Sequence, residues 1–493
     1  MSISKNNVQY ISLEGGGGAG NGYAGALKAL HELNILKYDE YKQTNIKGFA
    51  GASAGALTSV LLACGYTPYE LKIIMQMVNF EDFFDLGDIG EIPFKGGFTK
   101  KNLTQPPEPI VLKIIRLAIQ GLANKTDVMV LVFSNPDIIL QLYKELHQPE
   151  AVITFLALII GFVKDKEELP DKVRQILRQN IELIAMSIYY DWGIFIGKTP
   201  RLFIQTLINY AKARVKIYQY SRTIKNLLIE SKNAKVEYYD ERILKAWKPF
   251  SFLTEEKMKE LVIRTELGEL KKLTDDLNNS FIKSLSANNI TSDPKGTTFT
   301  DFAKIFECDL VIMGTNLETI KSHAFSASTT PDFYVEDAVR LSMSLPLFYK
   351  PFINKPQAAL NSSVNPPPVS DFLNGIWIDG GYLNNSPLNI FESDKTIGLR
   401  LEQGGEQRTV INNLFKFLSV WPLQMGVFGV GESNISQTIS DLKGYNSIIL
   451  DTKLADAPDG KARGIGLFNF RPPDDIYDEV NKNTYDTVKN YFK

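Results

Sequence analysis

Ser53 has the sequence surroundings of a nucleophile. It is the central residue of Gly51 to Gly55 (GASAG), which follows a short apolar segment at 45–50 and precedes a small-to-apolar segment at 56–64. The first segment predicts a strand and the second a helix. In such a unit a sharp turn holds the serine hydroxyl clear of the backbone, and Gly51 and Gly55 remove side chains that would clash. We therefore predict that Ser53 attacks an acyl carbonyl.

A serine hydroxyl is a weak nucleophile and needs a base to accept its proton. The chain has three histidines, His31, His147 and His323. In the chain order of the α/β-hydrolases the histidine follows the acidic residue, but no histidine follows Asp379, so a triad of that order built on Asp379 is excluded. No histidine has an orienting partner evident in the sequence, which leaves a carboxylate as the leading base.

Asp379 is the carboxylate that the sequence favours as the base. It ends the predicted strand Gly375 to Asp379 (GIWID) and precedes Gly380 and Gly381, which lets it point into a site at the edge of a sheet. With an ordinary pKa of ~3.9 the group is expected to be ionised at neutral pH, and it accepts a proton if geometry and oxyanion stabilisation compensate for the mismatch. The alternative is an aspartate that only shapes a turn.

A glycine-rich loop follows the first predicted strand, Val8 to Leu13, and consists of Gly15, Gly16, Gly17, Gly18, Ala19 and Gly20. Successive backbone N–H groups at a helix start suit a tetrahedral oxyanion, a role we assign to the first four of these glycines. The loop also fits the dinucleotide-binding pattern G-x-G-x-x-G. However, the acidic residues about 20 positions later, Asp39 and Glu40, do not end a second strand. The second predicted strand, at 45–50, leads to Ser53 instead of to an acidic residue.

The order of predicted elements indicates an α/β fold, with a largely parallel central sheet, helices on both faces and the site at the strand ends. The catalytic core is expected at 1–100 and 295–400. Between them, 101–294 has long amphipathic stretches such as 171–188 and 211–228, which predict a mainly helical insertion or cap. Residues 401–493 are expected to form a C-terminal helical region.

Composition excludes several classes of protein. The 493 residues are 44% hydrophobic and 22% charged with a net charge of −2, so no overall attraction to nucleic acid or anionic membrane is expected. The two cysteines exclude a disulfide framework. The longest apolar run, Ala151 to Val163, is shorter than the ~20 residues that span a bilayer. With no apolar signal at the N-terminus, we expect a soluble, membrane-peripheral protein, whose export would be non-classical.

Two segments have two interpretations each. Between Lys212 and Lys248 there are ten Lys or Arg residues and four Asp or Glu residues. This pattern fits a solvated helical face or a local patch for anionic lipid or an acidic partner. The apolar segment Ile411 to Val430 fits packed core helices or an exposed lip for lipid entry.

Four segments in order resemble the patatin-like phospholipases over roughly 8–80 and 295–400, namely GGGGAGNGYAGALKAL (Gly15 to Leu30), GASAG, AVRLSMSLPLFYKP (Ala338 to Pro351) and IDGGYLNNSP (Ile378 to Pro387). The resemblance implies the three-layer core of that family, a Ser53–Asp379 dyad that cleaves acyl esters of membrane phospholipids, and an oxyanion hole at the glycine loop. It implies no metal and no other cofactor.

Two features depart from the compact members of that family. Ala19 stands where they usually carry Arg or Lys, a side chain that would order the loop or attract the lipid phosphate. The insertion is similar to that of elaborated bacterial members, some of which are secreted effectors that need a host protein for activity. This likeness implies an activating host protein as a partner.

We thus expect a phospholipase A-type hydrolase that releases fatty acids and needs no calcium. Three alternatives stay open at this point: a neutral-lipid lipase or esterase, a catalytically silent scaffold that docks lipid or protein, and a dinucleotide-binding protein.

Overall fold

The computed structural model describes residues 3–39, 42–43, 45–77, 80–86, 110–124, 144, 171–230, 296–317, 319, 321–354, 373–402, 444–454, 463–465 and 471–493. The apolar segments at 151–163 and 411–430 and His147, which the sequence analysis considered, lie outside these residues.

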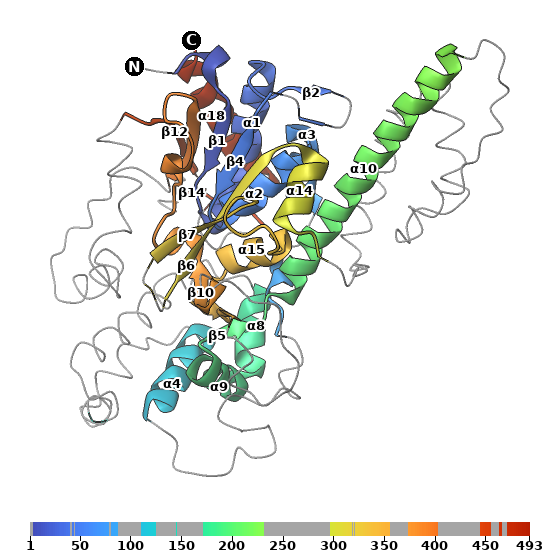
Figure 1. The fold of residues 1–493 in the computed structure, drawn as a ribbon. Coiled ribbons are helices and arrows are strands. Elements are labelled where there is room, and N and C mark those ends of the chain that lie inside the picture. The colour runs from blue at the N-terminus through green and yellow to red at the C-terminus, as the bar shows by residue number, and fades with distance from the viewer. Residues whose placement is uncertain are drawn as a thin grey trace, which may run out of the picture.

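The centre of the molecule is an eight-stranded sheet (Figure 1). Five strands run parallel in the order β12 (Asn446–Asp451), β11 (Thr396–Glu402), β1 (Tyr10–Leu13), β4 (Gly48–Gly51) and β6 (Asp309–Asn316). Three strands run antiparallel to their neighbours: β10 (Gly375–Asp379), β9 (Phe352–Asn354) and β7 (Lys321–Phe325). The prediction of an α/β fold with a largely parallel sheet is confirmed.

Among the described residues, six helices belong to the core around this sheet. They are α1 (Tyr23–Glu32), α2 (Ala54–Ala63), α3 (Pro68–Met77), α14 (Phe299–Phe306), α15 (Val335–Ser342) and α18 (Asp474–Tyr491). Their apolar side chains form one cluster with strand residues such as Ile11, Phe49 and Ile312. The neighbouring strand residues Ala50 and Val311 point to the other face, as the alternation of side chains along a strand requires.

Shorter elements complete the described core. The 3₁₀ helices are η1 (Lys5–Asn7), η2 (Gly17–Gly22), η3 (Phe80–Phe83), η7 (Gly380–Tyr382) and η8 (Leu388–Ile390). Two small hairpins pair β2 (Tyr38–Asp39) with β3 (Lys42–Gln43) and β13 (Lys453–Leu454) with β14 (Arg463–Gly464).

The C-terminal region, predicted to be helical, also supplies an edge strand. Helix α18 packs on α1 and on β12, and β12 joins the main sheet beside β11. In β12 only Ile448 and Leu450 are buried, while Ile449 is 47% exposed. Two buried residues are too few to give a clear period of two in a sequence.

The described part of the insertion is mainly helical and has its own apolar core. Helices α4 (Ile110–Asn124), α8 (Asp171–Gln179) and α9 (Ile181–Asp191) pack together with β5 (Gly193–Phe195). The amphipathic segment at 171–188 thus forms parts of two helices. Helix α10 (Lys198–Glu230) then runs back along α15 and projects away from the core in Figure 1.

A short parallel ribbon joins the insertion to the catalytic core. Strand β5 pairs with β8 (Leu347–Tyr349), which follows α15 in the chain. The rings of Phe84, Phe195 and Phe348 pack against one another in this second core. Strand β8 belongs to a segment of the predicted catalytic core. The second apolar cluster therefore contains side chains from both the insertion and the core.

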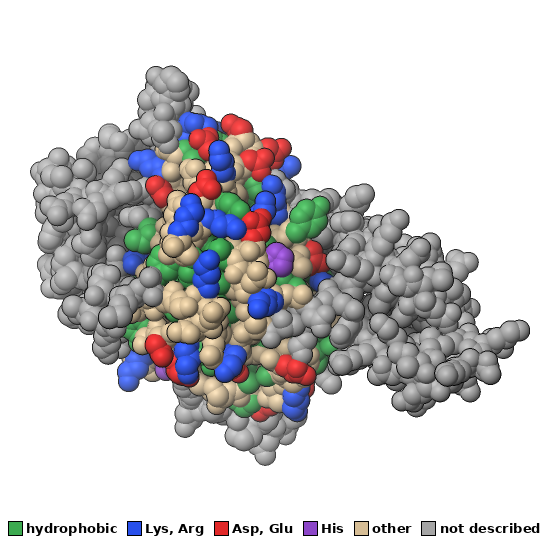
Figure 2. All heavy atoms as spheres, turned by 90° about the horizontal axis from the view of Figure 1, so that it is seen from above, with side chains coloured by type: hydrophobic (Ala, Val, Ile, Leu, Met, Phe, Trp, Pro, Cys, Tyr) green, Lys and Arg blue, Asp and Glu red, His purple; other side chains and the backbone are tan. Residues whose placement is uncertain are grey.

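The surface described here has no large patch of one charge on the face seen in Figure 2. Lys and Arg side chains are interspersed there with Asp and Glu side chains, in agreement with a net charge of −2. Among the described helices, none combines the length and apolar composition needed to cross a bilayer.

Candidate active site

Ser53 lies in a sharp turn between β4 and α2. Its backbone has φ 49° and ψ −121°, a conformation that costs a non-glycine residue roughly 1–3 kcal/mol and persists only where the surroundings enforce it. A Cβ on Gly55 would lie 2.2 Å from the Leu13 carbonyl oxygen, and one on Gly51 would lie 2.3 Å from the Gly55 oxygen. The close approach of β1 to the turn therefore requires Gly55, and the close approach of the first turn of α2 to the end of β4 requires Gly51.

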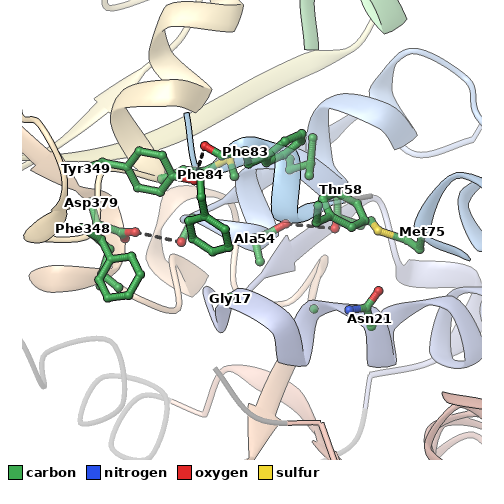
Figure 3. Close-up of a pocket in the computed structure, with 16 residues that line it drawn as sticks. Gly17, Asn21, Ala54, Thr58, Met75, Phe83, Phe84, Phe348, Tyr349 and Asp379 are labelled. Atoms are coloured by element: carbon green, nitrogen blue, oxygen red, sulfur yellow. Dashed lines mark hydrogen bonds between the residues drawn. The ribbon is translucent and has the colours of Figure 1, made fainter. Parts of the chain in front are cut away.

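The Ser53 hydroxyl donates a hydrogen bond of 2.8 Å to Asp379 Oδ2, across a sequence separation of 326 residues (Figure 3). The direction of β10 explains how they meet. Gly51 is level with Ile312 on β6, and Asp379 is opposite Gly314, two residues further along that strand. Because β10 is antiparallel to β6, it enters from beyond the carboxyl ends of the parallel strands and ends beside the serine turn.

Asp379 is held by the backbone on both sides. The Gly381 N–H donates 2.7 Å to Asp379 Oδ1, and Gly380 and Gly381 open the short helix η7. The Asp379 N–H donates 3.0 Å to the Ser344 carbonyl oxygen. Both oxygens of the carboxylate therefore have donors, and its orientation toward Ser53 is fixed.

Burial changes the acid–base character of Asp379. The residue is 6% exposed, and this burial raises its pKa to about 7, although the hydrogen bonds from Ser53 and Gly381 act to lower it. The ordinary pKa used in the sequence analysis does not include this desolvation, which a sequence does not reveal. A base with a pKa near the working pH suits proton transfer better than one with a pKa of ~3.9.

The glycine loop lies beside the serine turn. Gly17, which has φ 52°, begins η2, and Gly17 and Gly20 line the same cavity as Ser53. The Gly15 N–H, predicted to serve an oxyanion, instead donates 3.0 Å to the Asn385 carbonyl oxygen. Gly16, Gly17 and Gly18 lie at the helix start, where N–H groups have no partner within the helix.

Asn385 is a site residue that the sequence analysis missed. Its side-chain amide donates hydrogen bonds of 3.0 Å to the Gly15 carbonyl oxygen and 3.3 Å to Glu14 Oε1. Its backbone carbonyl accepts the Gly15 N–H. It therefore holds Gly15 from both sides. Its position within the segment Ile378 to Pro387 was the available signal, but that signal contained no indication of a role.

Ala19 is completely buried and does not line the cavity. In the compact family members a basic side chain at this position would order the loop or reach a phosphate. In this chain the position contributes only a methyl group to the core. The described histidines lie elsewhere. The His31 ring nitrogen is 2.9 Å from the Leu36 carbonyl oxygen, and His323, on β7, packs against Trp377 of β10.

A cavity that is open to solvent extends from the Ser53–Asp379 pair. Its walls are mostly apolar, and the rings of Phe83, Phe84, Phe348 and Tyr349 surround the pair in Figure 3. The lining residues are Gly17, Gly20, Asn21, Ser53, Ala54, Leu57, Thr58, Met75, Phe80, Phe83, Phe84, Met343, Leu345, Phe348, Tyr349 and Asp379. A Lys or Arg is absent from this set, so the lining can hold an acyl chain but offers no cation.

The part of the chain that the structure describes contains no group of three or more His, Cys, Asp or Glu residues arranged to hold a metal ion. The arrangement of Ser53, Asp379 and the backbone N–H groups has instead the elements of acyl transfer: a nucleophile, a base within hydrogen-bond distance and donors for an oxyanion.

The chain is similar to several known proteins, of which one was found by sequence and two by structure. An uncharacterized protein, R571, of Acanthamoeba polyphaga mimivirus is 28% identical over 155 residues, which is 30% of this chain and 43% of that protein. The structure of VipD from Legionella pneumophila has a TM-score of 0.39 at 18% identity and covers 99% of this chain and 67% of its own. ExoU of Pseudomonas aeruginosa, in complex with SpcU, has a TM-score of 0.32 at 15% identity, with 99% and 52% covered.

A family model described as patatin-like phospholipase matches residues 11–392, which include the glycine loop, the serine turn and Asp379. Because the match extends over most of the 493 residues, the chain belongs to the patatin-like phospholipase family.

Proposed function

We propose that this protein is a lipid acyl hydrolase of the phospholipase A type, in which Ser53 is the nucleophile and Asp379 the base. The observation that carries the proposal is the 2.8 Å hydrogen bond from the Ser53 hydroxyl to Asp379 at the end of a largely apolar cavity. A hydroxyl hydrogen-bonded to a carboxylate, beside a space in which an acyl chain can be buried, supports the proposal.

The reaction has two steps. Asp379 takes the proton of the Ser53 hydroxyl while the oxygen attacks the ester carbonyl, and N–H groups of Gly16, Gly17 and Gly18 stabilise the oxyanion. The intermediate expels the alkoxide of the lysophospholipid, which takes the proton back from Asp379. Water, deprotonated by the same carboxylate, then releases the fatty acid and restores Ser53. Family membership and the two-residue geometry support this scheme.

A neutral-lipid lipase or esterase is a second candidate because of one observation. The cavity lining includes no Lys or Arg, and Ala19 is buried where a basic residue could have attracted a phosphate. We favour phospholipid because family membership supports it.

The substrate that is hydrolysed distinguishes the two candidate functions. Wild type and Ser53→Ala are incubated with mixed phospholipid vesicles or with a triacylglycerol emulsion, and released fatty acid and lysophospholipid are measured by mass spectrometry. We expect Ser53-dependent release from the vesicles to exceed release from triacylglycerol by at least tenfold. The reverse order would identify a neutral-lipid lipase, and no Ser53-dependent release from either would support a docking scaffold.

We also propose membrane phospholipids and an activating host protein as partners. The same incubation with and without eukaryotic lysate tests the activator, and the docking scaffold is supported only if Ser53-dependent release is absent in both conditions. Ser53-dependent release that rises at least tenfold with lysate is the expected result, and equal release with and without lysate would remove the activator from the proposal.

A further inference from the structure

Arg340 is a buried cation outside the proposed catalytic pair. It lies on α15 and is 9% exposed, and burial lowers its pKa. Its guanidinium donates 2.6 Å to the Ile196 carbonyl oxygen and 2.7 Å to the Lys350 carbonyl oxygen. These two carbonyls stand one residue beyond the paired strands β5 and β8. Arg340 therefore binds the carboxyl end of the ribbon that joins the insertion to the core.

The backbone next to Arg340 is shaped around the guanidinium. Gly197 has φ 75°, and a Cβ on it would lie 2.8 Å from Arg340 Nε. The Gly197 N–H donates 2.7 Å to Asp85, which also accepts the Thr199 N–H at the start of α10. The chain thus turns in a left-handed conformation, and the left-handed turn leaves room for the planar side chain.

The same guanidinium reaches the segment that holds both members of the pair. Arg340 donates 2.7 Å to Ser344 Oγ, and the Ser344 carbonyl oxygen accepts the Asp379 N–H. Two residues earlier, Ser342 Oγ accepts the Ser53 N–H at 2.9 Å. The segment 342–344 therefore contacts the backbone of the nucleophile and of the base, and Arg340 holds one end of it.

The ribbon also forms part of the cavity. Phe348 and Tyr349 of β8 line it, as do Met343 and Leu345 on either side of Ser344. Arg340 therefore contacts both the end of the ribbon that lines the cavity and the serine whose carbonyl accepts the Asp379 N–H.

We propose that Arg340 is a positioning residue, which sets Asp379 in place for Ser53 by holding Ser344 against the carboxyl ends of β5 and β8. This inference rests on the proposed function. A planar group with several fixed donors suits three acceptors on three segments, and a lysine ammonium does not reproduce this arrangement. Because a displacement of about 1 Å at a reacting group can cost about 10²-fold in rate, the effect is expected in kcat and not in substrate binding.

The test compares Arg340→Met, Arg340→Lys and Gly197→Ala with a matched control, Arg201→Met. Arg201 also links α10 to α15, through Asp337, but it does not contact Ser344. Each protein is counted by complete labelling with a fluorophosphonate, and kcat and KM are measured on phospholipid vesicles. We expect kcat to fall about 10²-fold in Arg340→Met and about tenfold in the other two test variants, with KM within threefold. The control should stay within twofold of wild type.

Failure of this inference is distinguishable from failure of the proposed function. Wild-type release that Ser53→Ala abolishes supports the function by itself. If, with that result in hand, folded Arg340→Lys and Gly197→Ala both match Arg201→Met in kcat, Arg340 is not a positioning residue. This comparison decides the matter even if Arg340→Met does not fold.

Discussion

At the scale of single residues, Asp379 combines burial with two hydrogen bonds that favour its charged form. Burial dominates, so the pKa stands at about 7 in place of an ordinary value near 3.8. A group poised in this way is a base only in its deprotonated form. The acid–base behaviour of one side chain thus links the rate of the reaction and the stability of the fold to the same pH range.

The pH dependence of the rate follows from this pKa. We expect kcat/KM for a soluble short-chain ester to rise tenfold per pH unit below about pH 7 and to level off above it, with half of the plateau value near pH 7. Initial rates between pH 5 and pH 9 measure the profile. A rate that is constant over this range would contradict the assignment of Asp379 as the base.

Stability has the opposite dependence on pH. The folded-state pKa is raised, so protonation of Asp379 favours the folded state, and this contribution is lost as pH rises from the ordinary value through about 7. Asp379→Asn has no carboxyl group at this position, so its stability does not decrease with pH for this reason. Between pH 5 and pH 8.5 its free energy of unfolding should gain about 2–3 kcal/mol relative to wild type, from roughly two pH units at 1.36 kcal/mol each. Denaturant unfolding of both proteins at the two pH values checks it, and an unchanged difference would contradict the raised pKa.

At the scale of elements, the glycine loop depends on a residue from another part of the chain. Asn385→Ala removes the side-chain donors to Gly15 and Glu14 and leaves only the bond from the Gly15 N–H to the backbone carbonyl of residue 385, so the loop is held less firmly beside Ser53. We expect kcat to fall about 10–10²-fold with KM little changed, which is less than the 10²–10³ typical of losing an oxyanion donor outright. Steady-state kinetics on vesicles measure this, and wild-type kcat in the variant would show that the loop is held by other contacts.

Sequence patterns could predict the elements that begin and end at chemical groups. The strand before Ser53, the helix after it and the strand that ends at Asp379 all follow from short-range periodicity and glycine placement. The capping box of Thr67 and Glu70, in which both reciprocal hydrogen bonds are present, follows a local rule of the same kind. Local rules govern these features, so a local pattern is sufficient to find them.

Contacts between distant elements could not be predicted in this way. The two bonds between Asn385 and Gly15 and the bond from Ser53 to Ser342 join residues that are hundreds of positions apart. The antiparallel pairing of β10 with β6 also joins separate parts of the chain. The pKa of Asp379 belongs with these, because it depends on what the packed chain places around the carboxylate. The domain boundaries at 100, 294 and 400 stay predictions.

At the scale of the whole molecule, the cavity lies where the catalytic core meets the insertion. Leu57 and Met75 come from core helices, whereas Phe84 and Phe348 belong to the second apolar cluster with α4, α8 and α9. An acyl chain in this space would lie against side chains of the core segments, because none of the lining residues comes from 101–294. In our account the insertion affects substrate selection indirectly, by packing behind Phe84 and Phe348.

Acyl length should consequently control the rate. Each buried methylene contributes about 0.8 kcal/mol, so we expect kcat/KM to rise roughly fourfold per carbon over a series of soluble esters from acetyl upward, until the cavity is filled. Initial rates on esters of two to ten carbons test it at fixed pH. Rates that do not depend on chain length would place the acyl group outside this cavity.

The central claim is that Ser53 and Asp379 act together, and fatty-acid release from phospholipid vesicles by four proteins tests it most directly. These are wild type, Ser53→Ala, Asp379→Asn and the control Ser59→Ala, a buried serine of α2 whose hydroxyl has no hydrogen-bond partner in the described structure. The account predicts a loss of at least about 10³-fold in the first two variants and wild-type release in the control. Equal release by wild type, Ser53→Ala and Asp379→Asn would contradict it.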